Sequence, residues 1–536
     1  MTSEREHRPA LVDLCELRFE NTFVRDLPGD PVHENVPRRV RNACYTRVEP
    51  TPVRSPQLLA WSDRVGDLLG AASPDASTGP VADVLGGNRV LPGMQPYAAR
   101  YGGHQFGHWA GQLGDGRAIT LAEVVGPDGS RQELQLKGAG KTPYSRTADG
   151  RAVLRSSVRE FLCSEAMHHL GVPTTRALSL VATGEAVVRD MFYDGRPQPE
   201  PGAIVCRVAP SFVRFGNFQI LAAAGELDHQ RRLADYVIRT HFPEFGAPSP
   251  ATYARWQDEI GRRTALLLVE WMRVGFVHGV MNTDNMSILG LTIDYGPYGW
   301  LEGFDPQWTP NTTDAQEHRY RYGSQPQIAL WNFAQLAHAL APLIDDELAL
   351  ERSVAVYRDT YEAASRRMLA GKLGLRALDH DGDDALVADL FELLEAVETD
   401  MTLFFRGLAA VPLDATDDTA WVAPLRRAYY DEQAATPVQR ERLVPWLRRY
   451  AARVKRDGTS ARVLRMNGVN PKYVLRNYLA QQAIDALERG DTAVMARLSA
   501  VLQRPYDDQP EHDDLAERRP EWARHRPGCS ALSCSS

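Results

Sequence analysis

Side chains with the oxygen donors that divalent cations prefer lie close together near the middle of the chain. Asn285 stands in a short polar loop that begins at His278, and Asp294 ends an apolar run, Ile288 to Ile293, which we expect to be a strand. Amide and carboxylate oxygens are common ligands of Mg²⁺ and Mn²⁺. A second carboxylate, Asp284, directly precedes the asparagine and could accept a proton. The stretch therefore has the residue types for metal-assisted chemistry on a phosphate.

The order of these residues matches the ATP sites of protein kinases. In kinases a histidine-led loop supplies a metal-binding Asn, and the following segment delivers a metal-binding Asp into an Asp-aromatic-Gly turn. Here an apolar helix, Ala265 to Val274, leads into the loop, and Asp294 is followed by Tyr-Gly. The kinase loop also carries a catalytic Asp two residues after its histidine, where this chain has Val280. The alternative interpretation is a polar loop capped by Asx turns.

The upstream elements of such a site occur in the expected order, which favours the ATP site. Residues 101–117 are dense in glycine and aromatic side chains, and two strands are predicted after them, at 118–125 and 132–137. Gly114 and Gly116 would let the backbone approach phosphates closely, and Arg117 would add positive charge. Lys137 ends the second strand, as in a kinase N-lobe.

The run from Lys137 to Thr142 resembles a P-loop only superficially. The P-loop pattern requires a glycine where this chain has Gln135, and Pro143 follows the threonine. The residues after it would begin a helix poorly, so we reject a P-loop.

Further charged side chains lie on the next two predicted elements. A helix over residues 152–170 carries Glu160 and Glu165, either of which could hold Lys137 in place. A strand over 202–208 carries Arg207, and Arg214 follows it. The planar forks of two arginines suit a triphosphate.

Length and composition indicate a globular protein of two or more lobes. The 536 residues carry a net charge of −8, which gives no general nucleic-acid footprint. No apolar run is long enough for a membrane span, and the first residues carry acids and no apolar core, so neither a signal nor a transit peptide is expected. The scattered cysteines exclude a disulfide scaffold. We expect a cytoplasmic bacterial protein without membrane or nucleic-acid partners.

The remaining segments are predicted to be mainly helical. An amphipathic helix is expected at Pro56–Leu69, within an N-terminal extension, and two more at Gln325–Ile344 and Asp383–Val397. The polar tail from Gln509 is expected to be mobile. We expect an extension over 1–95, an N-lobe over 96–200, a C-lobe over 201–420 and a helical C-terminal extension with a Cys-containing tail over 421–536.

Several long motifs resemble those of the selenoprotein O (SelO, YdiU-type) family over nearly the whole chain. They are Gly103-His-Gln-Phe-Gly, Trp109-Ala-Gly-Gln-Leu-Gly-Asp-Gly-Arg117, Leu136-Lys-Gly-Ala-Gly140, Arg155-Ser-Ser-Val-Arg-Glu-Phe161, His278-Gly-Val-Met-Asn-Thr-Asp-Asn285, Asn470-Pro-Lys-Tyr-Val-Leu-Arg-Asn477 and Cys534-Ser-Ser536. The resemblance implies an α+β, protein-kinase-like bilobal fold with a β-rich N-lobe and a mostly helical C-lobe. It also implies an adenylyltransferase that binds ATP in a flipped orientation and moves AMP onto Ser, Thr or Tyr hydroxyls of proteins, self-modification included.

The resemblance also assigns roles to individual residues. The implied ATP contacts are Gly114, Gly116, Arg117, Lys137, Asp149, Gly150, Arg207, Arg214 and Asp294. Glu160, rather than Glu165, would orient Lys137. Asn285 and Asp294 would hold Mg²⁺ or Mn²⁺, and Asp284 would accept the proton. The alternatives are a kinase-type phosphotransferase, which would want a carboxylate at Val280, and a non-catalytic nucleotide-binding scaffold.

One feature of the family pattern is missing. Redox-regulated members pair a C-terminal cysteine or selenocysteine with a cysteine in the activation-loop segment, which here reads Asp305-Pro-Gln-Trp-Thr-Pro-Asn311. Cys534 therefore has no partner there. It is expected to stay a free thiol or to pair with Cys529, while Cys163 and Cys206 are expected in a core helix and a core strand.

Overall fold

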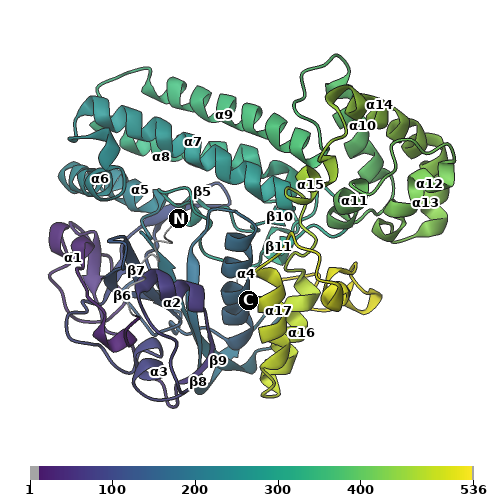
Figure 1. The fold of residues 1–536 in the computed structure, drawn as a ribbon. Helices are drawn as coiled ribbons and strands as arrows, with labels where there is room; N and C mark the ends of the chain where they lie inside the picture. Colours follow the sequence, from purple (N-terminus) through teal and green to yellow (C-terminus); the bar gives the residue numbers. More distant parts are fainter. Residues whose placement is uncertain (1–10, 534–536) are drawn as a thin grey trace, which may run out of the picture.

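Within residues 11–533, which the computed structural model describes, seven antiparallel strands form one sheet in the first lobe (Figure 1). Their order is β1-β3-β6-β7-β9-β8-β2. They are β1 Tyr45–Arg47, β2 Gln57–Trp61, β3 Tyr97–Ala99, β6 Ala118–Val125, β7 Arg131–Lys137, β8 Arg176–Arg189 and β9 Gln198–Ala209. A hairpin of β4 (Gly102–Gln105) and β5 (His108–Gln112) and a short pair, β10 (Phe276–Val277) with β11 (Gly299–Trp300), are separate from it.

Both faces of the sheet are covered. On one face, Ile204 and Cys206 of β9 join a core cluster with side chains of α2 (Asp63–Leu69) and α3 (Pro80–Leu85). On the other face, Ala203 and Val205 pack with α4 (Leu154–His169), which contains the buried Cys163. Because both faces of the sheet are covered, β6 and residues 203–206 of β9 read as nearly continuous apolar runs, whereas β7 alternates Leu134 and Leu136 with buried polar side chains. The predicted strands at 118–125, 132–137 and 202–208 and the helix at 152–170 are confirmed.

The N-terminal extension supplies β1 and β2, the two edge strands of this sheet. The single helix predicted for Pro56–Leu69 is wrong, because β2 occupies its first part and α2 begins only at Asp63. β2 pairs with β8, with Gln57 opposite Ala182. The helical spacing of apolar residues is a local signal, whereas the exposed edge of β8 offers hydrogen-bond partners that only the folded chain brings near.

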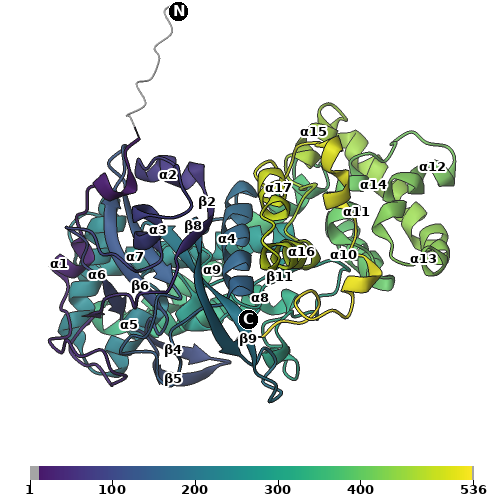
Figure 2. The ribbon, with the colours of Figure 1, turned by 90° about the horizontal axis from the view of Figure 1, so that it is seen from below.

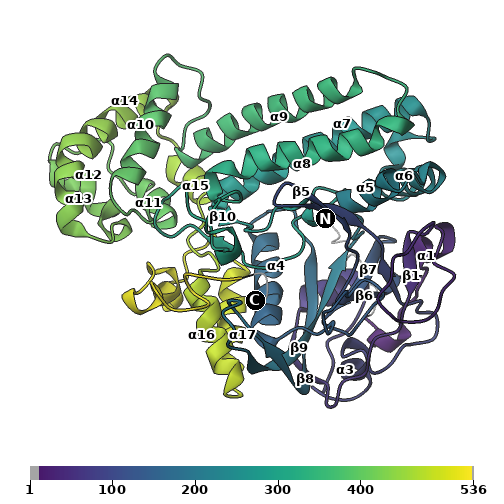
Figure 3. The ribbon, with the colours of Figure 1, turned by 180° about the vertical axis from the view of Figure 1, so that it is seen from behind.

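Long helices form the second lobe. α7 begins at a cap in which Ser249 Oγ accepts from the Thr252 N–H (3.2 Å), and it ends at Gly275, whose φ of 76° is left-handed. It packs against α8 and α9, and the three helices lie side by side in Figures 1 and 3. The helices of this lobe are α5 Phe215–Ala223, α6 Leu227–His241, α7 Pro250–Val274, α8 Gln325–Leu340 and α9 Ala349–Lys372.

The chain after α9 has two parts. Helices α10 to α14 join a core cluster that also includes Val277 of β10, Leu301 and Ala370 of α9, and α16 and α17 return to pack on α4 of the first lobe (Figure 2). The helices are α10 Asp383–Ala396, α11 Met401–Leu408, α12 Asp418–Val422, α13 Glu432–Val438, α14 Val444–Asp457, α15 Arg462–Asn467, α16 Asn477–Glu488 and α17 Ala493–Leu502, and a short α1 (Thr22–Asp26) lies near the N-terminus. None of the helices within residues 11–533 is long and apolar enough to cross a membrane.

The polar segment after α17 is packed on the rest of the protein as far as Ser533. Leu532 is buried, and its N–H donates to the Pro310 carbonyl (3.0 Å). The Thr312 N–H donates in turn to the Leu532 carbonyl (2.7 Å). The tail therefore lies against the segment between Asp305 and Asn311. The polar composition of the tail, from which we expected mobility, does not predict this contact. Cys534 lies outside the described residues.

Candidate active site

A cavity of about 700 Å³ lies between the sheet and the loop that follows α7. The predicted site residues that line it are Gly114, Gly116, Arg117, Lys137, Asp149, Gly150, Arg207, Asp284, Asn285 and Asp294. Glu160 and Arg214 lie behind its wall, where each contacts a lining residue. No helix follows Thr142 directly, since α4 begins only at Leu154, in accordance with the rejection of a P-loop.

Lys137 is held by Glu160 rather than by Glu165. The lysine ends β7 and its Nζ lies 2.5 Å from Glu160 Oε2 on α4. Glu165, one and a half turns further along the helix, pairs with Arg176 (2.7 Å). Burial lowers the pKa of Lys137, and the charge of Glu160 opposes that shift. The ion pair keeps a buried ammonium charged and aimed into the cavity.

Asp294 contacts both arginines that the resemblance places at the triphosphate. Its Oδ1 lies 2.5 Å from Arg207 Nη1, and its Oδ2 pairs with Arg214 Nη1. Arg207 also reaches Glu160 Oε1 (3.3 Å). Burial alone would raise the pKa of Asp294, but Arg214 and Arg207 hold it well below its ordinary value. The carboxylate is therefore ionised, and the ion pairs form one connected network from Lys137 to Arg214.

The chain before Asp294 is not a strand, contrary to the prediction for residues 288–293. Only isolated bridges occur there, with Met286 opposite Thr292, because Gly290 turns the chain with a left-handed φ of 73°. His278 fixes the far end of this segment, since its Nε2 lies 2.9 Å from the Ile293 carbonyl oxygen. The buried histidine thus supports the loop and does not line the cavity.

Asp284 is covered by the β4–β5 hairpin. The His104 N–H donates to Thr283 Oγ1 (2.7 Å), and a Cβ on Gly103 would lie 2.5 Å from Asp284 Oδ1, so only glycine fits there. Within the described residues that buried Oδ1 has no hydrogen-bond partner. Burial raises the pKa of Asp284 to about 7, although Arg214 opposes the shift. A carboxylate with a pKa near neutrality suits a general base.

The donor set around Asp294 fits a divalent cation. The Asn285 side-chain N–H donates to the Val280 carbonyl (2.8 Å), and its amide oxygen accepts no hydrogen bond within the described residues. Together with Asp294, this makes a set of two hard oxygen donors that line one cavity. Such a set suits Mg²⁺ or Mn²⁺.

Three other lining residues, Tyr101, Asp115 and Arg189, were not singled out from the sequence. The Tyr101 ring lies under the Arg214 guanidinium at 4.5 Å. Asp115 is buried, which raises its pKa, and its carboxylate accepts from the Ala99 N–H (2.9 Å). Arg189 pairs with the predicted contact Asp149 (2.7 Å). Asp115 stands between Gly114 and Gly116, so the glycine-rich stretch could have pointed to it as a site residue. No local sequence pattern pointed to Arg189.

A family model described as "Protein adenylyltransferase SelO" matches residues 32–503. Proteins described as "Protein nucleotidyltransferase YdiU" are similar over nearly their full length. That of Nitrosospira multiformis is 65% identical (98% of each chain), that of Azoarcus sp. strain BH72 59% (97% of this chain, 99% of the relative) and that of Xanthomonas campestris pv. campestris strain 8004 58% (98% and 100%).

Among solved structures, this chain is similar to ROP2 from Toxoplasma gondii, which is described as a virulence factor with a protein-kinase fold and no enzymatic activity. The match covers 55% of this chain and 86% of the ROP2 chain. The identity is 13% and the TM-score 0.24, a likeness too loose to support an argument. The protein-kinase-like fold is evident from the chain itself: a sheet lobe and a helical lobe enclose a cavity with the Lys137–Glu160 pair on one side and Asn285 and Asp294 on the other.

Proposed function

This chain belongs to the SelO family of protein adenylyltransferases, and we propose that it moves AMP from ATP onto Ser, Thr or Tyr hydroxyls of proteins and releases pyrophosphate. The observation that carries the proposal is the connected network behind the cavity. Three cations, Lys137, Arg207 and Arg214, share two carboxylates, Glu160 and Asp294. The network therefore keeps an excess of positive charge, which suits a polyanionic donor.

The arginines are suited to stabilise the leaving group. Attack on the α-phosphorus breaks its bond to the bridging oxygen, and negative charge accumulates on the departing pyrophosphate. Arg207 and Arg214 are nearly fully buried, so their charges act in a water-poor environment where they stabilise a developing anion strongly. Triphosphate oxygens would then share, or take over, the contacts that Asp294 makes in this structure.

Asn285 and Asp294 are the residues that would hold Mg²⁺ or Mn²⁺. When bound, the ion neutralises phosphate charge and helps to orient the triphosphate. Asp294 is oriented for this by a left-handed backbone (φ 57°) and by its two arginines. Asn285 is oriented by the Val280 carbonyl.

Asp284 is the proposed proton acceptor. The attacking hydroxyl loses its proton to Asp284 as its oxygen bonds to the α-phosphorus, and the carboxyl later returns the proton to solvent. Val280 occupies the position of the kinase base. Because the transition state of such transfers is loose, positioning and electrostatics contribute more than the base, and a displaced carboxylate is adequate.

The test compares the fate of two phosphates. We expect label from the α-phosphate of ATP to enter the protein in the presence of Mg²⁺ or Mn²⁺, and label from the γ-phosphate to stay out. In intact-mass spectra of self-modified protein, AMP adds about 329 Da and a phosphoryl group about 80 Da, because the two transfers break different bonds. Equal incorporation of γ-label would favour the kinase alternative, and no incorporation with tight ATP binding would favour the scaffold.

The matched control is Lys137→Ala. It should abolish labelling without unfolding the protein, because Glu160 keeps Arg207 as a partner (3.3 Å). The same proposal places the reaction in the bacterial cytoplasm, where ATP is supplied, with proteins rather than nucleic acids or membranes as acceptors.

A further inference from the structure

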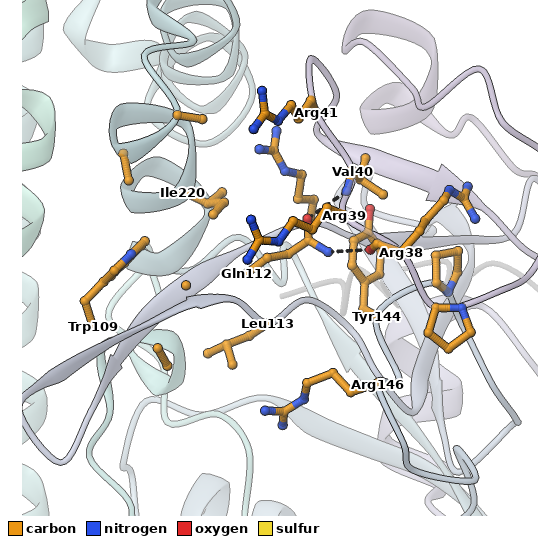
Figure 4. Close-up of a pocket in the computed structure, with 17 residues that line it drawn as sticks. Arg38, Arg39, Val40, Arg41, Trp109, Gln112, Leu113, Tyr144, Arg146 and Ile220 are labelled. Carbon is orange, nitrogen blue, oxygen red and sulfur yellow. Dashed lines mark hydrogen bonds between the residues drawn. The ribbon is translucent and has the colours of Figure 1, made fainter.

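A second cavity, of about 720 Å³, adjoins the proposed ATP cavity. Residues 37–41 form one side of it, β5 crosses it, and the end of α5 closes the other side (Figure 4). Leu113, Tyr144 and Arg146 line both cavities, so the two share a wall. Nothing in the proposed transfer step uses this second cavity, which we call the arginine pocket.

The arginine pocket is strongly cationic in a chain whose net charge is −8. Five arginines and no carboxylate line it. Arg38 pairs with Asp30 (2.6 Å) and Arg100 with Glu226 (2.7 Å). The other three, Arg39, Arg41 and Arg146, are exposed and have no ion-pair partner within residues 11–533. Like charges held together without counter-charges favour an anionic ligand.

The wall of the pocket is held in place by hydrogen bonds. The Gln112 side chain of β5 accepts from the Val40 N–H (2.9 Å) and donates to the Arg38 carbonyl (2.8 Å), as the dashed lines in Figure 4 show. Tyr144 is fixed from behind, where its hydroxyl lies 2.9 Å from Thr46 Oγ1. The backbone that carries Arg39 and Arg41 is thus fixed beside β5, which lowers the entropic cost of binding.

The opposite side offers the exposed ring of Trp109 and a strand edge. Trp109 is 41% exposed, and Ile220 and Leu113 lie beside it in Figure 4. Among the described strands β5 pairs only with β4, and its residues 109–112 all line the pocket. A polypeptide in an extended conformation fits a groove of this kind, whereas a lone phosphate would leave most of it unfilled.

We propose that the arginine pocket binds an acidic, extended segment of the protein substrate and so brings a nearby hydroxyl to Asp284. This inference rests on the proposed function and adds its substrate class. Arg39 and Arg41 would pair with Asp or Glu side chains of that segment, and Trp109 would cover an apolar neighbour. The shared wall at Leu113 and Tyr144 places the acceptor hydroxyl only a few residues from the acidic run, at roughly 3.3 Å of chain per residue.

The experiment uses the full chain and two synthetic peptides that carry one Ser, one Thr and one Tyr beside either an Asp/Glu run or the same run changed to Asn/Gln. AMP transfer is measured for the wild type and for the double variant Arg39→Glu, Arg41→Glu. We expect the kcat/KM of the wild type to be about tenfold or more higher for the acidic peptide, because the KM for that peptide is lower. The double variant should lose that preference and keep its KM for ATP.

A charge-matched control is Arg440→Glu, Arg456→Glu. Both residues are exposed, lack an ion pair within the described residues and lie on the distant C-terminal extension near α14. This control should keep the preference. Equal rates for the two peptides with the wild type, or loss of the preference in the control, would overturn the proposal. So would a raised KM for ATP in the Arg39/Arg41 variant, which would assign the pocket to the nucleotide.

A binding measurement separates this inference from the proposed function. Fluorescence anisotropy of the labelled acidic peptide, without ATP, should show binding that is weakened about tenfold in the Arg39/Arg41 variant. Peptide binding without any AMP transfer would support the peptide site and contradict the proposed activity. AMP transfer without a preference for the acidic peptide would support the activity and contradict the peptide site. Competition by a polyuridine RNA as strong as that by unlabelled peptide would show a general polyanion site and overturn the proposal.

Discussion

Asp294 is the carboxylate on which the two buried arginines depend. Arg207 and Arg214 are 3% and 1% exposed, and both point at it. A residue predicted as an ATP contact and a metal ligand is therefore also the counter-charge of the two arginines expected at the triphosphate. Substitutions at this position should affect both stability and activity.

We predict that Asp294→Ala abolishes AMP transfer and lowers the thermal midpoint. Removing the Asp294 carboxylate leaves the buried Arg214 with no ion-pair partner within residues 11–533 and Arg207 with Glu160 alone, a loss of about 3–5 kcal/mol in unfolding free energy. Calorimetry without nucleotide and an α-label assay measure the two effects. Asp149→Ala, which breaks the more exposed pair with Arg189, should cost at most about 1 kcal/mol. Wild-type stability of Asp294→Ala would show that the arginines need no counter-charge.

Asp284 owes its proposed role to its surroundings. It lines the proposed ATP cavity, and no hydrogen bond from the described residues occupies its Oδ1, so the carboxylate can accept a substrate proton. We predict that Asp284→Ala lowers kcat by about 10² to 10⁴, the usual contribution of a general base, with a nearly unchanged KM for ATP. Steady-state kinetics check this. A near-normal kcat would reduce the residue to a positioning role.

At the scale of elements, β7 carries a buried carboxyl besides Lys137. Glu133 accepts from the Phe212 N–H (3.3 Å), while its Oε1 has no partner among residues 11–533. Burial, with a contribution from the nearby charge of Glu123, raises the pKa of Glu133 to about 8. In the folded protein this group therefore holds its proton at neutral pH, whereas the unfolded chain releases it.

We predict that Glu133→Gln stabilises the protein at pH 8 and has little effect near pH 4. The folded pKa lies above the unfolded value, so the wild type loses stability as pH rises from about 4.5 to about 8, at about 1.4 kcal/mol per pH unit at most. The glutamine variant lacks this loss. Urea unfolding at several pH values measures the difference, and Glu347→Gln, an exposed residue, serves as control. A difference that does not grow with pH would contradict the assignment.

At the scale of the whole molecule, the C-terminal tail reaches the activation-loop segment without a cysteine in that segment. The contacts are the backbone hydrogen bonds between Leu532 and residues 310 and 312. Cys529 is buried in the tail, and burial raises the pKa of its thiol to about 11. The thiol therefore stays protonated at neutral pH and is a poor nucleophile. The loop from Asp294 to Gln325 contains no sulfur for a disulfide.

We predict that reductant does not activate the enzyme. AMP transfer to one substrate should be equal with and without dithiothreitol, in the wild type and in Cys534→Ser. A several-fold activation by dithiothreitol that disappears in Cys534→Ser would show that the tail locks the enzyme through another cysteine. A pairing of Cys534 with Cys529 would close only a short ring and should constrain the tail alone.

The sequence by itself singled out the candidate site residues and their order. Gly114, Lys137, Asn285 and Asp294 stand in or beside local patterns, and the central strands and α4 follow from continuous or periodic apolar runs. These patterns involve residues close together in the chain, so they can be recognised without knowledge of the fold.

Only the tertiary structure decided which partners these residues have. It turned Gln57–Trp61 into an edge strand, because the hydrogen bonds of β8 were available there. It joined Asp294 to Arg207 and Arg214, and it placed Arg39 and Arg41 across from β5. Ion pairs and strand edges are satisfied by whatever the folded chain brings within reach, and no local pattern records that choice.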